Sequence, residues 1–387
     1  MSLVVDEHRQ YLSDEARLSA FRQAIREVVK PGDVVVDLGS GTGIMGLLAC
    51  QAGAKRVYSI EETGIIQLAR ELAQANGFEN QVCFIKDLST RATLPEPVDV
   101  VVADQIGRFG FDAGIFEYFS DARKRFLKPQ GRTIPSRIDL EISPVEHQEM
   151  WNQIEFWNES PGGLRFHPAR ALAANTGYPV KYSPEQLLGN PCVLAALDPS
   201  RTPASIFGLQ ASVTVERAGT LHGIGGWFSA QLSEHVTLSN SPLVKERINR
   251  HNVFFPIDRP VPVTKGDRIQ TKINILPADM VITWSVEVWG PAAEGQSKPE
   301  GQRKARFTHS TFQGMLLCTE DLHKTRPDFA PRLSSWGEAR RSILELCDGR
   351  RRLPEIEQEV YCRHSELFRS PAEVAKFVAE VTNRYAL

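Results

Sequence analysis

A run of valines that ends in a glycine-rich turn constrains the fold of this 387-residue chain more than any other feature. Segment 34–46 reads Val-Val-Val-Asp-Leu-Gly-Ser-Gly-Thr-Gly-Ile-Met-Gly. Successive β-branched residues predict a buried strand, and glycines directly after it let the backbone turn tightly and approach a ligand closely. The next segment predicts a helix whose first N–H groups face the same ligand. We therefore expect a strand, a ligand-binding turn and a helix, in that order.

Apolar runs that alternate with helical patterns predict a parallel sheet in the first third of the chain. Runs 56–60, 82–85 and 98–102 follow the first strand, and apolar residues at helical spacing over 14–29 precede it. Continuous β-branched runs separated by helices are typical of a parallel sheet covered on both faces. We expect a Rossmann-like α/β domain over residues 1–135.

After residue 135 the pattern changes twice. Short alternating segments with frequent turns predict an antiparallel β-barrel or sandwich over 136–320, with a solvated hairpin loop at 290–301. From 333 to 387 the apolar spacing is helical again and predicts a small helical, winged-helix domain.

Composition excludes some classes of partner. A net charge of −2 gives no field that attracts nucleic acid, and no apolar run reaches the roughly 18 residues that cross a bilayer. The N-terminus lacks the pattern of a signal peptide, so we expect a cytoplasmic protein. The six cysteines are scattered without a Cys-x-x-Cys, so we expect neither a metal site nor disulfides.

Acidic residues at three successive strand ends favour one type of cofactor. Asp37 stands two residues before the first glycine, where it suits the amino group of a methionine moiety and would repel a pyrophosphate. Glu61 and Glu62 end the second strand and can take ribose hydroxyls, and Asp87 ends the third, near an adenine edge. The turn also matches the dinucleotide fingerprint G-x-G-x-x-G, but the placement of Asp37 favours S-adenosylmethionine over NAD.

The chain resembles the protein arginine methyltransferase family from about residue 8 to 318. The resemblance rests on four stretches: the segment 8–17, the glycine turn and its surroundings, the Phe-Leu-Lys-Pro-Gln-Gly-Arg-Thr-Ile-Pro of 126–135, and the motifs at 221–228 and 239–242. It implies an N-terminal helix that encloses the cofactor, with Arg17 on the methionine carboxylate and Tyr11 beside the sulfonium. It also implies a head-to-tail homodimer, for which 157–191 is the candidate arm.

The acceptor residues depart from the family pattern. Members that act on arginine hold the guanidinium with two glutamates and a supporting Thr-His-Trp segment. Here these positions read Asp104 and Ala113, and Arg247-Ile248-Asn249, with His251 just beyond. A guanidinium stays charged at neutral pH and needs carboxylates around it, so arginine is in doubt as the acceptor. A hydroxyl, carboxylate, imidazole or amide acceptor could use Asp104 or His251 as a base or positioning group.

These observations predict a particular set of site residues. Those expected at the cofactor are Tyr11, Arg17, Asp37, Gly39, Ser40, Gly41, Gly43, Glu61, Glu62 and Asp87, and those expected at the acceptor are Asp104 and His251.

The segment 342–356 resembles PqqD-like modules, which bind leader peptides in peptide-modifying pathways. The hypothesis that follows is a methyltransferase acting on a side chain of a protein or of a leader-bearing peptide. Its rivals are a small-molecule O- or N-methyltransferase, and a non-catalytic scaffold that binds S-adenosylmethionine.

Overall fold

The computed structural model describes residues 4–201, 207–276, 281–291 and 301–385. The chain divides into two compact units, Met1–Met315 and Leu316–Leu387, and each is described by itself.

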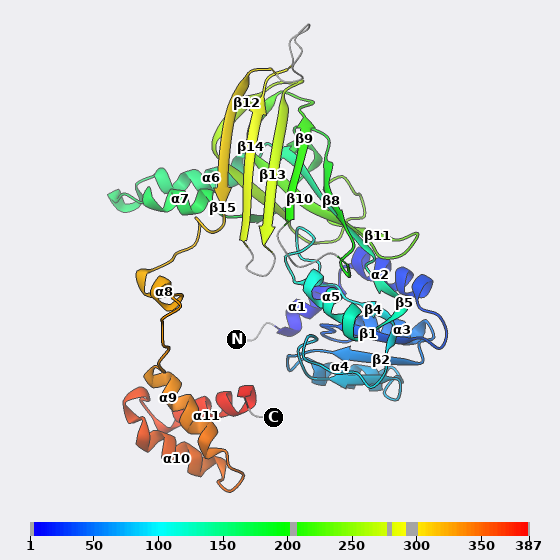
Figure 1. The fold of residues 1–387 in the computed structure, drawn as a ribbon, viewed down its shortest axis with the longest axis vertical. Helices are drawn as coiled ribbons and strands as arrows, with labels where there is room; N and C mark the ends of the chain where they lie inside the picture. The colour runs from blue at the N-terminus through cyan, green and yellow to red at the C-terminus, as the bar shows by residue number, and fades with distance from the viewer. Residues whose placement is uncertain (1–3, 202–206, 277–280, 292–300, 386–387) are drawn as a thin grey trace. The chain divides into compact units, whose positions relative to one another are not determined.

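Five strands form a sheet in the order β3-β2-β1-β4-β5, and every described pairing in it is parallel (Figure 1). The strands are β1 (Val34–Leu38), β2 (Arg56–Ile60), β3 (Val82–Ile85), β4 (Val98–Val102) and β5 (Leu127–Ile134). The helices between them are α3 (Ile44–Gln51), α4 (Ile66–Ala75) and α5 (Ile115–Arg125). β1 is buried along its whole length, as expected for a central strand covered on both faces.

The strand order reverses beside β1, because β2 lies on one side of it and β4 on the other. In open sheets of this kind, ligands bind outside the carboxyl ends of the strands at that point. The glycine turn after β1, Glu61 after β2 and Asp104 after β4 therefore reach the same edge of the sheet.

Two helices precede the sheet, α1 (Val4–Leu12) and α2 (Glu15–Val28). Asp14 separates them, because its carboxylate accepts a hydrogen bond from the backbone N–H of Arg17 (3.2 Å) and so caps the start of α2. The buried face of α2 consists of residues at helical spacing, namely Arg17, Phe21, Ala24 and Ile25.

Two antiparallel sheets follow the parallel sheet in this unit. One has the order β7-β12-β10-β6-β8 with β11 paired to β10, and the other has the order β15-β14-β13-β9. Their bounds are β6 (Arg137–Val145), β7 (Tyr178–Val180), β8 (Cys192–Leu197), β9 (Phe207–Thr214), β10 (Gly219–Gln231), β11 (Thr237–Ser239), β12 (Asn252–Val263), β13 (Arg268–Leu276), β14 (Val281–Trp289) and β15 (Arg303–Ser310). Phe255 of β12 packs on Trp284 of β14, whose indole N–H donates to the Pro256 carbonyl (2.7 Å).

The segment predicted as a dimerisation arm combines short helical turns with irregular stretches. It contains α7 (Pro168–Ala174), three 3₁₀ turns and β7, and it follows α6 (Gln148–Glu155). Figure 1 shows α6 and α7 beside the antiparallel sheets. The 3₁₀ turns are η1 (Phe156–Asn158), η2 (Pro161–Gly163) and η3 (Pro184–Gln186).

The second unit is helical over its described residues, 316–385. Its elements are α8 (Thr319–Lys324), α9 (Ser335–Leu346), α10 (Leu353–Arg363), η4 (Ser365–Leu367) and α11 (Pro371–Tyr385). The apolar faces of α9, α10 and α11 share one core, which includes Ile343, Val360 and Val378. Those described residues contain helices and no strand, and the winged-helix assignment stays a prediction.

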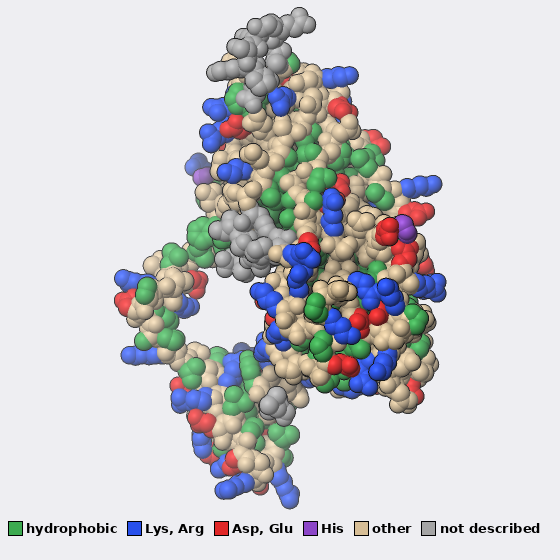
Figure 2. All heavy atoms as spheres, turned by 45° about the vertical axis from the view of Figure 1, so that its right-hand side comes forward, with side chains coloured by type: hydrophobic (Ala, Val, Ile, Leu, Met, Phe, Trp, Pro, Cys, Tyr) green, Lys and Arg blue, Asp and Glu red, His purple; other side chains and the backbone are tan. Residues whose placement is uncertain are grey.

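The predicted combination of a parallel-sheet core with antiparallel sheets is confirmed. Residues 292–300 of the predicted hairpin loop lie outside the described residues. Among the helices that are described, none is both long and apolar enough to span a membrane. On the face drawn in Figure 2, basic and acidic side chains are interspersed, in keeping with the nearly neutral composition.

Candidate active site

The glycine turn after β1 has the backbone that its sequence predicts. Gly39, Gly41 and Gly43 have φ angles of +61°, +55° and +78°, a region that L side chains rarely adopt. A Cβ on Gly39 would collide with the amide group of Gln105, which follows β4. Glycine is needed there both for the turn and for the close approach of the next loop.

Asp37 lies beneath the turn, near the end of β1, and its side chain is 1% exposed. Its Oδ2 accepts a hydrogen bond from the Gly46 backbone N–H (2.9 Å) in the first turn of α3. Burial raises the pKa of this carboxyl to about 7, and the charge of Glu61 adds to the effect, while Gly46 and Arg17 oppose it. Asp37 is therefore a buried acid that titrates near neutral pH.

Glu61, after β2, faces the same turn. Its Oε2 accepts from the Gly41 backbone N–H (3.0 Å) and its Oε1 from the Thr63 N–H (2.9 Å). A cavity of about 150 Å³ lies beside it and includes four of the predicted residues, Gly39, Glu61, Glu62 and Asp87. Its other lining residues are Ile60, Leu88, Ser89, Gln105 and Tyr118.

Among the described residues, three buried polar atoms without a hydrogen-bond partner belong to a residue that lines this cavity or to a sequence neighbour of one. They are the Ser40 hydroxyl in the turn, the Ser59 hydroxyl on β2 and Oε1 of Gln105. Buried polar atoms are nearly always paired in folded proteins, so unpaired ones in a cavity fit a polar ligand. Together with the acids, these donors and acceptors suit a ligand that carries hydroxyl, amino and ring nitrogen groups.

Helix α1 covers the glycine turn through His8. A Cβ on Gly41 would come within 2.6 Å of the imidazole Cε1, so the ring lies directly over the turn. Tyr11, near the end of α1, is 51% exposed, and its carbonyl accepts a hydrogen bond from Nη1 of Arg17 (3.1 Å). The Arg17 guanidinium also lies 5.4 Å from the centroid of the Tyr11 ring.

Asp104, directly after β4, is paired with two arginines. Nε of Arg17 donates to Oδ2, and Nη2 of Arg250 lies 3.0 Å from Oδ2 and 3.2 Å from Oδ1. Burial opposes ionisation of this carboxyl, but Arg250 and then Arg17 outweigh it and lower the pKa of Asp104. Asp104 is therefore a carboxylate at neutral pH, with both oxygens engaged by cations of this chain.

The rest of the acceptor loop forms a tight turn. Oδ1 of Asp112 accepts from the backbone N–H groups of Arg108 (2.7 Å) and Phe109 (2.9 Å). Ala113 is exposed, as is Glu117 on α5. The carboxylate nearest in sequence to Ala113 is therefore already used by the turn itself.

The segment aligned with Thr-His-Trp has structural contacts. Ile248 is buried, Nη1 of Arg247 donates to the Tyr182 carbonyl (2.9 Å), and the Asn249 N–H donates to the Asp14 carboxylate (2.8 Å). The Asn249 contact links the start of α2 to the antiparallel sheets.

His251 is an exposed residue. Partial burial of its ring, followed by the charges of Lys181 and Arg108, lowers its pKa. Of the described side chains in segment 247–251, Arg250 and not His251 contacts Asp104.

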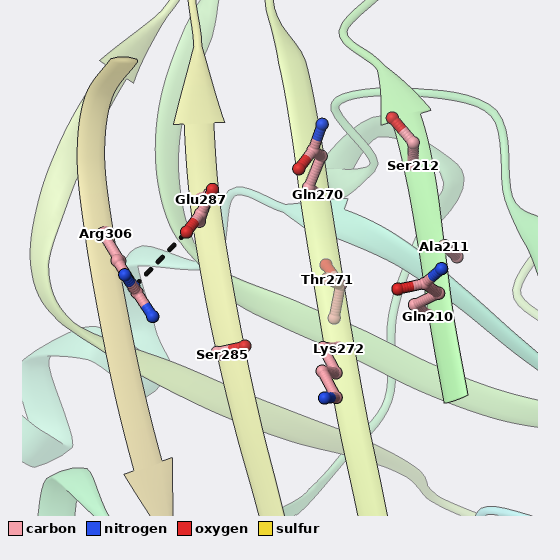
Figure 3. A pocket seen from close by; sticks show the side chains of 9 residues that line it. All are labelled: Gln210, Ala211, Ser212, Gln270, Thr271, Lys272, Ser285, Glu287 and Arg306. Atoms are coloured by element: carbon pink, nitrogen blue, oxygen red, sulfur yellow. Dashed lines mark ion pairs between the residues drawn. The ribbon is translucent and has the colours of Figure 1, made fainter. Parts of the chain in front are cut away.

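A larger cavity, of about 490 Å³, lies on one face of the β9-β13-β14-β15 sheet (Figure 3). It includes the ion pair between Arg306 and Glu287 (3.3 Å). None of the predicted site residues lines it. The volume of a cavity therefore does not identify the active site here. The smaller cavity beside Glu61, which predicted residues line, is the candidate site.

Comparison with known proteins places the chain in a family. The model of the arginine methyltransferase oligomerization subdomain matches residues 137–288, and that of ribosomal protein L11 methyltransferase matches 20–156. Protein arginine N-methyltransferase 6 of Xenopus laevis is 31% identical over 287 residues, which cover 70% of this chain and 84% of that protein. This chain belongs to the protein arginine methyltransferase family. It is an S-adenosylmethionine-dependent methyltransferase, as its sequence predicts.

Solved structures support the fold of this methyltransferase. Protein arginine methyltransferase 10 of Arabidopsis thaliana superposes with a TM-score of 0.67 at 22% identity, covering 79% of this chain and 97% of that one. The Trypanosoma brucei PRMT1 enzyme-prozyme complex superposes with a TM-score of 0.68 at 19% identity, covering 78% and 97%.

Three residues at the site escape the sequence reasoning, namely His8, Gln105 and Arg250. His8 opens the segment 8–17 and Gln105 follows Asp104, so their position in or beside a recognised motif was the available signal for both. Arg250 stands one residue before His251 and directly after the altered Thr-His-Trp segment. The signal for its role was a charged residue next to Asn249, which replaces the tryptophan of the family pattern.

Proposed function

We propose that this methyltransferase transfers a methyl group from S-adenosylmethionine to a side chain of a protein or peptide that enters beside Asp104. One observation carries the proposal. Asp104 forms ion pairs with both Arg17 and Arg250. Arg17 lies on α2, and Arg250 lies in the loop before β12, in the antiparallel part of the unit. The place where the cofactor half and the acceptor half of the fold meet is thus one buried ion-pair cluster.

The cofactor supplies a methyl group on a positively charged sulfur, which needs no further activation. The role of the chain is therefore to bind and orient. In this proposal Asp37 faces the amino group, Arg17 the carboxylate and Glu61 the ribose. The backbone of Gly39, Ser40, Gly41 and Gly43 approaches the ligand, with Glu62, Asp87 and Tyr11 at its rim.

Asp104 acts as a positioning residue in this proposal. A general base must have a free lone pair and a pKa near the working pH. Both oxygens of Asp104 accept hydrogen bonds from guanidinium groups, and its pKa is lowered. His251 is proposed as a base, because the residue is exposed and its pKa is lowered below 6.5, so the ring is neutral at pH 7.

The remaining parts of the fold suggest how a substrate is recruited. We propose that the antiparallel sheets close into a barrel and that segment 157–191 serves as the arm of a homodimer. Phe156, Leu164 and Phe166 are exposed apolar side chains in or beside that segment, and such residues favour a partner surface. We also propose that the helical unit is a PqqD-like module that holds a leader peptide. A cytoplasmic location stays a prediction.

The proposal can be tested with cell extract from a strain that lacks the gene. Purified enzyme and S-adenosylmethionine with a labelled methyl group are expected to label protein or peptide. Label confined to small molecules would support the small-molecule alternative, and cofactor binding without any transfer would support a scaffold.

A variant pair tests the cofactor residues. Glu61→Gln removes a charged acceptor and is expected to weaken S-adenosylhomocysteine binding about tenfold by calorimetry. Glu71→Gln, on an exposed face of α4, is the matched control and is expected to bind as the wild type does. Equal affinities for both variants would remove Glu61 from the cofactor site.

A further inference from the structure

The place proposed for the acceptor, beside Asp104, already contains a guanidinium, that of Arg250. Its Nη2 binds both oxygens of Asp104, and its Nη1 donates to the Gly107 carbonyl at 3.3 Å. The Arg250 side chain is 15% exposed, so part of it is open to solvent. The N–H of Nε takes part in none of the hydrogen bonds described for these residues and is available to a ligand.

Arg250 is held in place from several sides. Its guanidinium lies 5.9 Å from the centroid of the buried Phe228 ring. Nδ2 of Asn240 donates to the carbonyls of Arg108 and His251, both at 2.9 Å, and so fastens the acceptor loop to the segment that carries Arg250. The contact with Asp104 therefore belongs to a fixed arrangement.

The charges of the pocket disfavour an arginine substrate. Two guanidiniums, of Arg17 and Arg250, face the Asp104 carboxylate, and Asp112 is the further acid whose charge reaches Arg250. Asp112 Oδ1 is used by two backbone N–H groups, and the second glutamate position is Ala113. A substrate guanidinium would be a third such cation, beside an Asp104 engaged on both oxygens and an Asp112 engaged on one.

The same arrangement favours an acceptor that needs no base. A hydroxyl or amide must lose a proton as it is methylated, and neither oxygen of Asp104 is free to take one. His251, the other candidate base, makes no described side-chain contact with Asp104, whereas Arg250 does. A carboxylate is already ionised at neutral pH and is attracted to a guanidinium with a free N–H.

Building on the proposed function, we infer that Arg250 makes this a pocket for a carboxylate side chain or chain end, and that the product is a methyl ester. One oxygen of the acceptor carboxylate forms a bond to the methyl carbon while the bond from that carbon to sulfur breaks. The electron pair of the broken bond stays on sulfur, so the sulfonium becomes a neutral thioether and the carboxylate a neutral ester. No proton is taken up or released.

The stability of the product towards alkali tests this inference. Protein labelled by the enzyme in the extract is treated with mild alkali, which hydrolyses methyl esters and leaves methylated arginine intact. Most of the label is expected as volatile methanol. Label that survives alkali and is recovered as methylarginine would overturn the inference and leave the proposed function standing. No label in any protein or peptide would instead count against the proposed function, and the inference with it.

Variants at position 250 provide the second test. Arg250→Gln is expected to lower ester formation at least tenfold, and Arg250→Lys, which keeps the charge, to retain more of it. Arg22→Gln, which removes an exposed arginine on α2, is the control and is expected to behave as the wild type does.

Binding gives a readout apart from turnover. In enzyme saturated with S-adenosylhomocysteine, a fluorescent peptide with one glutamate is expected to bind about tenfold more tightly than its glutamine counterpart, and Arg250→Gln to abolish that preference. Equal affinity of wild-type enzyme for the two peptides would count against the inference.

The double variant Arg250→Gln with Ala113→Glu tests the inference in the opposite direction, as a gain of arginine methylation. It restores two carboxylates without the internal guanidinium and is expected to shift the label from alkali-labile to alkali-stable products. A double variant that is folded by circular dichroism and still forms the ester at the wild-type rate would show that Arg250 does not select the acceptor.

Discussion

Asp37 is a carboxyl group that burial holds near its midpoint of titration at neutral pH. Its pKa of about 7 in the folded chain exceeds the ordinary 3.8, so ionisation opposes folding, and its contribution to stability decreases as the pH rises from 3.8 to about 7. A positively charged amino group placed beside it would favour the ionised form. Binding of the cofactor should therefore remove a proton from Asp37.

We expect the affinity for S-adenosylhomocysteine to rise roughly fivefold to tenfold between pH 6 and pH 7.5. Calorimetry at pH 7, in two buffers of different ionisation enthalpy, should detect release of about half a proton per site. Asp37→Asn should remove most of both effects. A wild-type affinity that does not change with pH would rule out Asp37 as the partner of the amino group.

Asn240 is the residue that joins the acceptor loop to the antiparallel sheets. It is 1% exposed, accepts a hydrogen bond from the Phe228 N–H (3.0 Å) and donates two to backbone carbonyls. Asn240→Ala leaves these buried groups unpaired and is expected to lower the free energy of unfolding by about 2–4 kcal/mol, measured in urea. Asn158→Ala, at an exposed site, is the control, with a change within about 0.5 kcal/mol.

At the scale of elements, α1 behaves as a cover for the glycine turn. Its described residues are largely exposed, and the position of His8 over Gly41 is its closest approach to the cavity side of the sheet. Deletion of residues 1–12 keeps the Asp14 cap of α2. It is expected to change the melting temperature of the unliganded protein by a few degrees at most. We expect S-adenosylhomocysteine to dissociate at least tenfold faster from the shortened protein in stopped-flow measurements. Unchanged dissociation would show that α1 does not enclose the cofactor.

The elements also show which parts of the fold the sequence could predict. The valine runs and the glycine turn are local patterns, and each predicted strand of the parallel sheet is present at its predicted place. The prediction of S-adenosylmethionine as cofactor followed from the charge of Asp37 near the end of the first strand. The family to which the chain belongs confirms it. Local patterns carry that information because a buried strand leaves a continuous apolar run in its own residues.

The contact between Asp104 and Arg250 could not be predicted in this way. The two residues are 146 positions apart, and no periodicity links a loop after β4 to a loop before β12. Counting from the Ser241-Pro242 motif reached Arg247, Ile248 and Asn249 and pointed onward to His251. The contact of Arg250 with Asp104 therefore had to be found in the structure. The roles of Asp104 and His251 stay predictions.

At the scale of the whole molecule, the two compact units can be tested separately. The unit 1–315 contains the cofactor cavity and the Asp104 cluster. A protein truncated after Met315 is expected to bind S-adenosylhomocysteine within about twofold of the full chain. If the helical unit holds the substrate, labelling of the native substrate should fall at least tenfold, because the effective concentration is lost. Full labelling by the truncated protein would exclude a recruiting role for residues 316–387.

The ion-pair cluster at Asp104 also bears on how acceptor preference can drift between relatives. Arg250→Gln alone would leave the carboxylate of Asp104, and one carboxylate cannot bind a guanidinium from two sides. Ala113→Glu alone would place an acid near Gly107, whose carbonyl already holds Arg250, and would supply that arginine with another anchor. Neither replacement by itself gives an arginine-binding pocket. In the inferred scheme, an exchange between carboxylate and arginine acceptors therefore requires both replacements.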